Sequence, residues 1–78
     1  MHKQNIVGAQ VRKYRYQQGL TQEMLVGRCA ARGWDISRGT LSKIEAQVRC
    51  VTDHELLMLS KALKVGLGAL YPSQLGAK

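Results

Sequence analysis

The chain has 78 residues, enough for one small domain, so we expect a single domain over residues 1–78 with a core at 6–71 and a tail at 72–78. No apolar run approaches the roughly 20 residues that cross a bilayer, and the N-terminal residues lack the apolar centre of a secretion signal, so we expect a cytoplasmic protein without membrane contact. The formal net charge of +7 favours a polyanionic partner, most commonly nucleic acid, although cations that only solvate the surface would give the same sum.

The first predicted helix covers residues 4–18, where Val7, Val11 and Tyr14 recur at the i, i+4 and i+7 spacing of a helical stripe. We expect the helix to end at Gly19, a residue type that readily adopts the left-handed conformation of helix C-termini. Residues 1–18 hold cations and no acid, so this segment contributes +4 of the net charge. The cations are Lys3, Arg12, Lys13 and Arg15.

The second predicted helix opens at Thr21, whose hydroxyl can cap the first backbone N–H groups, and Gly33 stops it. Leu25 and Cys29 are four residues apart and would face inward. Gly27 lies inside this helix, where glycine costs up to about 1 kcal/mol relative to alanine. We therefore expect close packing against a neighbour to compensate for Gly27.

The chain then turns a corner that contains Trp34, which either packs on the core, as we favour, or shields the corner. Ser37 caps a third helix over residues 38–46. Leu41 and Ile44 form its apolar stripe, and its other face is rich in small, polar and cationic side chains. A short helix with two such faces, supported by the helix before it, suits insertion into the major groove of DNA.

Residues 47–51 have no clear period and form a predicted loop. Thr52 and Glu55 then make a capping box that opens a fourth helix, which we expect to end near Lys64. Residues 67–71 form a short fifth helical turn that Pro72 stops. Because no segment has strand alternation, we predict an all-α, compact bundle of about five short helices. The inward residues of the fourth helix are Leu56, Leu59, Ala62 and Leu63.

The two cysteines, Cys29 and Cys50, are interpreted as a buried apolar residue and an incidental thiol rather than as a disulfide. With His2 and His54 they could supply four zinc ligands, but the short Cys–Cys or His–His spacing that begins such sites is missing. We therefore predict no metal and no cofactor. The serines and histidines form no nucleophile–base pattern, and no glycine-rich phosphate loop follows a strand, so we predict no enzymatic activity.

Arg38, Gly39, Thr40 and Lys43 are the candidate base contacts, because they share the face of the third helix opposite its apolar stripe. An arginine at the start of a groove-bound helix can donate two hydrogen bonds to O6 and N7 of guanine. Thr40 offers a hydroxyl to a base edge or phosphate and a methyl to thymine, and Gly39 allows close approach. A solvated helix face would explain any one of these residues alone, but their clustering favours DNA.

Gln22 lies at the start of the second helix, where exposed N–H groups favour a phosphate. Its amide can bind phosphate and brace a neighbouring side chain, although an ordinary polar residue in a first turn would look the same. Arg15 and Glu45 are either unrelated surface charges or a partly buried ion pair that ties the first helix to the third. We favour the pair, because each residue directly follows one at the edge of the core, and its role would be structural.

Three stretches of the chain resemble the phage-repressor/Cro type of helix-turn-helix domain. They are R-K-Y-R-x₃-G-L-T-Q-E, D-I-S-R-G-T-L-S-K-I-E and V-T-D-H-E-L-L-M-L-S-K-A-L-K-V, and the resemblance covers roughly residues 6–71. It implies a lambda-repressor-like domain with the helix-turn-helix at helices 2 and 3, usually acting as a dimer on paired half-sites. It also implies the base contacts and the ion pair named above. The predicted contacts to the DNA backbone are Gln22, Ser37, Ser42, Gln47, Arg49 and Lys13.

The chain departs from this family pattern at two places. The path from Gln22 to Ser37 is several residues longer than usual, so the second helix, the turn or both must be extended. Val26 occupies the position where the family usually places alanine or glycine for close helix contact, with Gly27 next.

These features predict sequence-specific binding of double-stranded DNA by a transcriptional regulator, most simply a repressor. Its partners would be DNA and a second copy of the chain on a two-fold operator, with no small-molecule ligand evident. The alternative is a protein-interaction module that keeps the fold, such as the antitoxin of a toxin–antitoxin pair or an adaptor to the transcription machinery. For that role Leu67, Leu70 and Leu75, expected to be exposed, would supply the contact surface.

Overall fold

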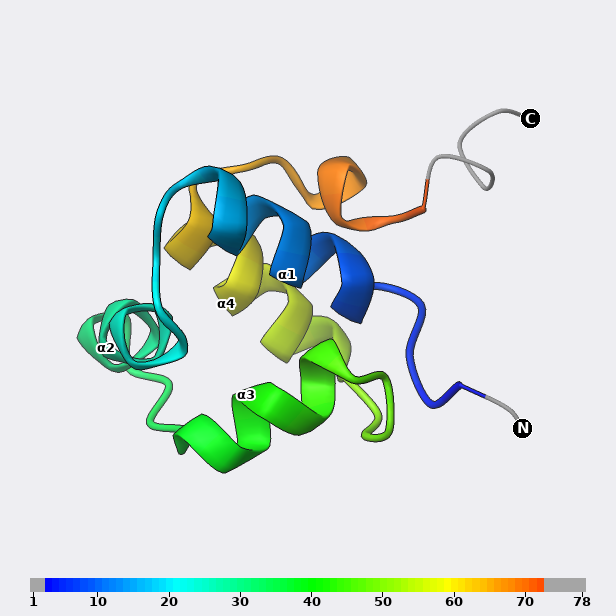
Figure 1. Ribbon diagram of the computed structural model, residues 1–78, viewed down its shortest axis with the longest axis horizontal. Helices are drawn as coiled ribbons and strands as arrows, with labels where there is room; N and C mark the ends of the chain where they lie inside the picture. Colours follow the sequence, from blue (N-terminus) through cyan, green and yellow to red (C-terminus); the bar gives the residue numbers. More distant parts are fainter. Residues whose placement is uncertain (1–2, 73–78) are drawn as a thin grey trace.

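The computed structural model describes residues 3–72, in which four α-helices and a terminal 3₁₀ turn surround one core (Figure 1). The predicted all-α fold is confirmed, and the described residues contain no strand. The expected fifth helix is a single 3₁₀ turn. Within the described part of the chain, no helix is long and apolar enough to span a membrane. The elements are α1 (Gly8–Gln17), α2 (Gln22–Ala31), α3 (Arg38–Glu45), α4 (Asp53–Leu63) and η1 (Leu67–Leu70).

Apart from the start of α1, the helices begin and end near the residues that the local sequence predicted. Thr21, Ser37 and Thr52 each accept a hydrogen bond, 3.1 Å long, from the backbone N–H three residues later. The capping box at Thr52 is complete, as predicted. Gly19 and Gly33, with φ of 69° and 89°, end α1 and α2 in the left-handed conformation. These capping interactions are local, so they mark the helix ends without any contact between distant residues.

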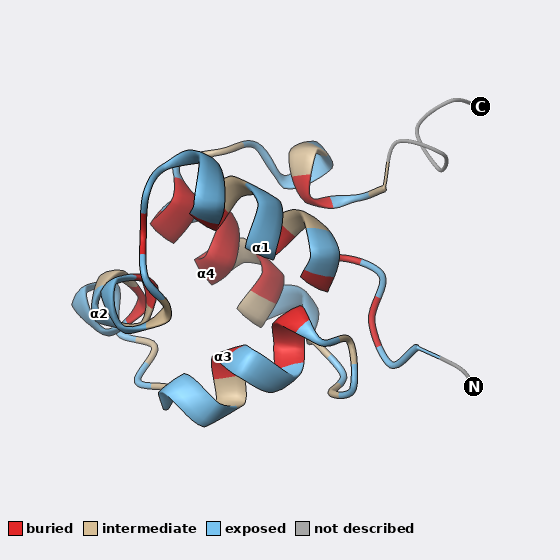
Figure 2. Cartoon of the chain, viewed as in Figure 1, coloured by how far each residue is buried: buried red, intermediate tan, exposed pale blue. Residues whose placement is uncertain are grey.

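The core lies between the helices and is lined by every element (Figure 2). The predicted inward residues of α2 and α4 are all buried, which confirms the helical pattern. Trp34 is half-buried and packs against this core, as we favoured. The fully buried larger side chains are Val11, Leu25, Cys29, Leu41, Ile44, Leu59, Leu63 and Leu70.

The first helix begins later than predicted, at Gly8 rather than near Gln4. The buried side chain of Asn5 accounts for the difference, because its Oδ1 accepts a hydrogen bond from the N–H of Gly8 at 2.7 Å. Its Nδ2 donates to the carbonyl oxygens of Ile44 and Arg49, at 3.1 and 2.8 Å. Residues 3–7 are thus pinned to the C-terminal end of α3 instead of extending α1.

Gly8 allows α1 to approach the end of α3 closely. A Cβ atom at this position would collide with the carbonyl oxygen of Ile44. Gly27, by contrast, is exposed, and a Cβ atom there would meet nothing within 4 Å. The expectation that Gly27 permits close packing was therefore wrong, and the close contact is made at Gly8.

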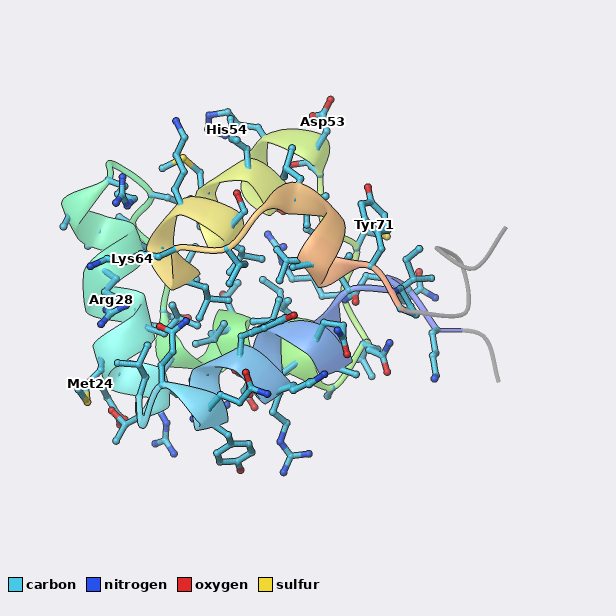
Figure 3. All side chains as sticks on the ribbon, turned by 90° about the horizontal axis from the view of Figure 1, so that it is seen from above. Met24, Arg28, Asp53, His54, Lys64 and Tyr71 are labelled. Atoms are coloured by element: carbon cyan, nitrogen blue, oxygen red, sulfur yellow. The ribbon has the colours of Figure 1, made fainter. Side chains whose placement is uncertain are left out.

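The path from Gln22 to Ser37 divides into helix α2 and a connection to α3. Helix α2 ends at Ala31 after 10 residues, so residues 32–37 form the connection to α3. Val26 is half-buried against the core on the inner side of α2. Arg28 also ties α2 to α4, donating 3.2 Å hydrogen bonds to the carbonyl oxygen of Ala62 and to the side chain of Gln18 (Figure 3).

The C-terminal turn differs from the expectation of three exposed leucines. Leu67 is 44% exposed, but Leu70 is completely buried, and Leu75 lies outside the described residues. Tyr71 follows the turn rather than belonging to it and is 41% exposed (Figure 3). Leu70 therefore anchors η1 to the core instead of serving as a contact surface.

Candidate nucleic-acid interface

Helix α3 lies at one side of the molecule with a free outer face (Figures 1 and 2). Leu41, Ile44 and Glu45 on its inner face are buried. Gly39 and Lys43, four residues apart, are exposed on the opposite side. Because residues four apart lie one above the other on a helix, these two mark the outermost line of α3. The face carries small and cationic groups and no acid.

A buried ion pair holds α3 to α1. Arg15 Nε lies 2.7 Å from Glu45 Oε2, and Arg15 Nη2 donates to Glu45 Oε1 at 3.0 Å. Arg15 Nη1 also donates to the carbonyl oxygen of Leu20 at 2.9 Å. The hydrogen bond with Glu45 is the main cause that raises the pKa of Arg15. Two parallel hydrogen bonds fix both the distance and the orientation between the two helices.

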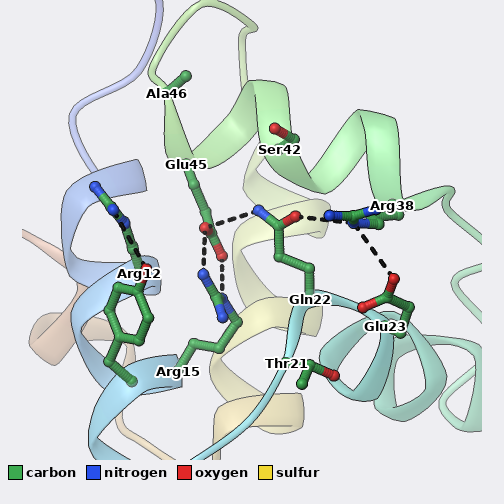
Figure 4. Close-up of a pocket in the computed structure, with 10 residues that line it drawn as sticks. Arg12, Arg15, Thr21, Gln22, Glu23, Arg38, Ser42, Glu45 and Ala46 are labelled. Carbon is green, nitrogen blue, oxygen red and sulfur yellow. Dashed lines mark hydrogen bonds and ion pairs between the residues drawn. The ribbon is translucent and has the colours of Figure 1, made fainter.

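Gln22 connects this ion pair to the start of α3 (Figure 4). Its Nε2 donates to Glu45 Oε1 at 3.2 Å, and its Oε1 accepts from Arg38 Nε at 3.2 Å. The carboxylate can only accept, so the amide must turn its nitrogen towards Glu45 and its oxygen towards Arg38. The predicted bracing role of Gln22 thus has a specific partner, the arginine at the head of α3.

Arg38 is also paired with Glu23, with Nε 3.4 Å from Oε2. Both side chains are exposed, at 65% and 66%. The head of α3 is therefore held on its α2 side by two consecutive residues of the first turn of α2.

A hollow of about 530 Å³ lies between α1, the start of α2 and α3. It brings together Gln22, Arg38 and Ser42 from the predicted set, and Figure 4 shows the residues around it. It also contains Arg12 and Tyr16, which the sequence analysis did not select. The sequence held a signal for both, since Arg12 lies three residues before Arg15 and Tyr16 four residues after Arg12, the spacings that share a side of a helix.

Arg12 and Tyr16 form a unit on the exposed rim of the hollow. Arg12 Nη2 donates to the Tyr16 hydroxyl at 3.3 Å, and its guanidinium lies 5.2 Å from the ring centre. The hydrogen bond from Arg12 is the main cause that lowers the pKa of Tyr16. Lys13 is exposed too, but it lies over the ring of Tyr14 at 5.6 Å and does not line the hollow.

Thr40 is half-buried at the flank of α3, and its hydroxyl accepts a 3.1 Å hydrogen bond from Ser37 Oγ. Ser37 is therefore occupied by the cap of its own helix. Ser42 is exposed on the flank that faces the hollow. The residues around the head of α3 thus divide into a hollow side with Arg38 and Ser42 and a cap side with Ser37 and Thr40.

Gln47 and Arg49, predicted to approach the DNA backbone, both make internal contacts in the loop after α3. Gln47 adopts a left-handed conformation with φ of 65° and donates from Nε2 to the carbonyl oxygen of Asn5 at 3.2 Å. Arg49 forms two 2.9 Å hydrogen bonds with the carboxylate of Glu55. This pairing raises the pKa of Arg49 and lowers that of Glu55. Both residues stabilise the loop.

The described cysteines are unpaired thiols. Cys29 is buried, which raises its pKa to about 11, and Cys50 is exposed. Residues 3–72 hold no group of three or more histidine, cysteine or acidic side chains that could bind a metal ion. His2, one of the four ligands considered above, lies outside the described residues.

One comparison with known proteins gives a match. A family model described as helix-turn-helix matches residues 11–70, from the middle of α1 to the end of η1 and well over half of the chain. No curated protein and no solved structure matches the sequence.

Proposed function

Because the chain belongs to the helix-turn-helix family, in its phage-repressor/Cro type, and is a DNA-binding domain of the kind found in transcription regulators, we propose that it binds one specific double-stranded DNA site and acts as a repressor. The observation that carries this proposal is the free outer face of α3, with Arg38 held at its head by Gln22. In the proposed complex α3 lies in the major groove, and the hollow beside it follows the phosphate backbone.

Arg38, Gly39, Thr40 and Lys43 are the proposed base contacts. Arg38 supplies a bidentate donor to guanine, and Gly39 lets the backbone of α3 come close to the base edges. Because Thr40 is half-buried at the flank, its contact is limited to a base or phosphate at one edge of the footprint. Lys43, on the outermost line of α3, reaches deepest into the groove.

Gln22 and Ser42 lie where a phosphate strand would pass along the hollow, and the start of α2 offers free N–H groups to it. We add Arg12 and Tyr16 to these backbone contacts because they line the same hollow. Lys13 and Ser37 stay in the proposal as flanking contacts. Contacts by Gln47 and Arg49 would be made while both keep their internal partners.

A homodimer on a two-fold site is part of the proposal, because a single helix of 8 residues reads too few base pairs to define a site in a genome. Exposed apolar groups on the far side of the chain favour protein contact there. Ile6 and Tyr71 are 45% and 41% exposed and line a common hollow of about 380 Å³. The same surface supports the second candidate function, a protein-interaction module with this fold.

The experiment is selection of bound duplexes from a random pool, followed by salt titrations on the selected and on a random duplex. We expect one enriched site and an affinity that falls steeply with salt, each neutralised phosphate adding about −0.9 to the log–log slope. Arg38→Ala should cost about 1–3 kcal/mol and relax preference at one base pair. A pool with no enriched site, together with capture of a protein partner by the Ile6 and Tyr71 surface, would favour the second function.

A further inference from the structure

We propose that Glu23 is a specificity-determining positioning residue that acts through Arg38, orienting its guanidinium so that the terminal amino groups meet guanine. The inference rests on the proposed function. It gives a role in DNA recognition to an acidic residue, whose charge is opposite to that of the cations proposed to face DNA. An acid beside a phosphate-binding surface weakens binding to every duplex, so its presence next to Arg38 calls for an explanation.

The hydrogen bond of Arg38 to Gln22 and its ion-pair contact with Glu23 both involve Nε. Nε donates to Gln22 Oε1 at 3.2 Å and lies 3.4 Å from Glu23 Oε2. Within residues 3–72, Nη1 and Nη2 of Arg38 form no hydrogen bond, so the end of the fork is left free. That end carries the two parallel N–H groups that match O6 and N7 of guanine. Pairing at Nε therefore leaves the base-reading donors available.

Gln22 alone does not fix the guanidinium. A single hydrogen bond from Nε leaves the planar group free to swing about it, whereas a carboxylate on the same side also attracts the guanidinium and restricts the plane. Glu23 supplies that carboxylate from the next residue of α2, in an ion pair without a hydrogen bond (Figure 4). Gln22 is itself oriented by its hydrogen bond to Glu45. Two consecutive hydrogen bonds therefore connect the buried ion pair to Arg38.

Glu23 also lies in the first turn of α2, where an acid interacts favourably with the positive end of the helix dipole. That role concerns stability and predicts no effect on base preference. The cap of α2 is already supplied by Thr21, which accepts the hydrogen bond from Met24 N. Asp53 offers a control matched in charge and helix position, because it is an exposed acid in the first turn of α4 and takes part in no ion pair within the described residues (Figure 3). It lines the hollow of Ile6 and Tyr71, so the two variants are compared on half-sites, where contact with a second copy plays no part.

The test compares Glu23→Gln with Asp53→Asn on three kinds of duplex: one half of the selected site, that half-site with each base pair replaced in turn, and random DNA. We expect both variants to bind random DNA more tightly, because each removes a negative charge. Only Glu23→Gln should lower discrimination, by about two- to fivefold and at the Arg38 base pair alone, matching the strength of an exposed ion pair. In the Arg38→Ala background, Glu23→Gln should change all duplexes equally.

A second readout needs no DNA. The ¹Hε–¹⁵Nε NMR signal of Arg38 in the free chain should move on Glu23→Gln and stay in place on Asp53→Asn. An unmoved signal would overturn the inference whatever the binding data show. So would a loss of discrimination that persists without Arg38. A wild-type chain that binds all duplexes equally would instead overturn the proposed function, and the positioning role of Glu23 with it.

Discussion

Glu45 serves both the stability of the domain and the position of Arg38. Its carboxylate accepts from Arg15 in the interior and from Gln22 at the surface, so three helices meet at one group. A buried ion pair stabilises the folded state little more than apolar side chains of the same size would. Removing one partner, however, leaves the other charge buried without compensation, which is strongly destabilising. We therefore infer that the main role of Glu45 is geometric: its contacts fix the positions of α1, α2 and α3 relative to one another.

Replacing Arg15 with Ala should cost about 3–5 kcal/mol in the free energy of unfolding, because Glu45 would stay buried without its cation. This loss is comparable with the whole stability of a small domain. Urea unfolding measures it. The double variant Arg15→Met, Glu45→Leu removes both charges and should lose less. Equal losses for the single and double variants would contradict the stranded-charge explanation.

The Arg49–Glu55 pair predicts a pH dependence. Arg49 holds the pKa of Glu55 below its ordinary value of 4.5 in the folded chain, so the unfolded state binds more protons as pH falls. The stabilisation that this ion pair gives the folded chain is therefore complete above pH 4.5. It is lost as the pH falls through the lower pKa that Glu55 has in the folded chain. In Glu55→Gln, urea unfolding between pH 6 and pH 3 should vary less steeply than in the wild type. Identical profiles would show that this pair does not contribute.

At the scale of the helix, the glycines of this chain differ in what surrounds them. Gly27 has open space where its Cβ would lie, whereas Gly8 faces the carbonyl oxygen of Ile44. The connection between α2 and α3, residues 32–37, ends at Ser37, which caps α3. Local capping chemistry therefore governs most helix ends. How closely two helices approach depends instead on a glycine at the point of contact, as at Gly8.

Gly27→Ala should raise the free energy of unfolding by up to about 1 kcal/mol, because alanine loses less backbone entropy in a helix and meets no atom here. Thermal or urea unfolding measures the gain, and DNA affinity should not change. Gly8→Ala is the matched control and should destabilise the chain, since α1 and α3 would have to separate. A destabilised Gly27→Ala would show that α2 packs against something at this position.

At the scale of the whole molecule, the proposed DNA face and the exposed apolar groups lie on different elements. Arg12, Gln22 and Arg38 line one hollow, and Ile6 and Tyr71 line another. In the proposed homodimer, this separation would let each copy bind DNA while it contacts the other.

We expect two chains on the selected duplex, measured by analytical ultracentrifugation of the complex. Tyr71→Ser with Ile6→Ser should reduce this to one chain per duplex and weaken binding to the full site more than to a half-site. Lys61→Ser, exposed on α4, serves as a control and should leave the stoichiometry at two. One chain on the full site in the wild type would remove the homodimer from the proposed function.

The order of the helices, their ends other than the start of α1, and the family were predictable from the sequence. Caps at Thr21, Ser37 and Thr52 and stops at Gly19 and Gly33 act over a few residues, so their chemistry can be read along the chain. The apolar periodicity gave the inward faces for the same reason. The tertiary structure decided the rest, because the outcome depends on groups far apart in the chain. Asn5 fastens onto residues 44 and 49, Leu70 turns inward, and Arg38 meets Gln22 and Glu23 across the turn.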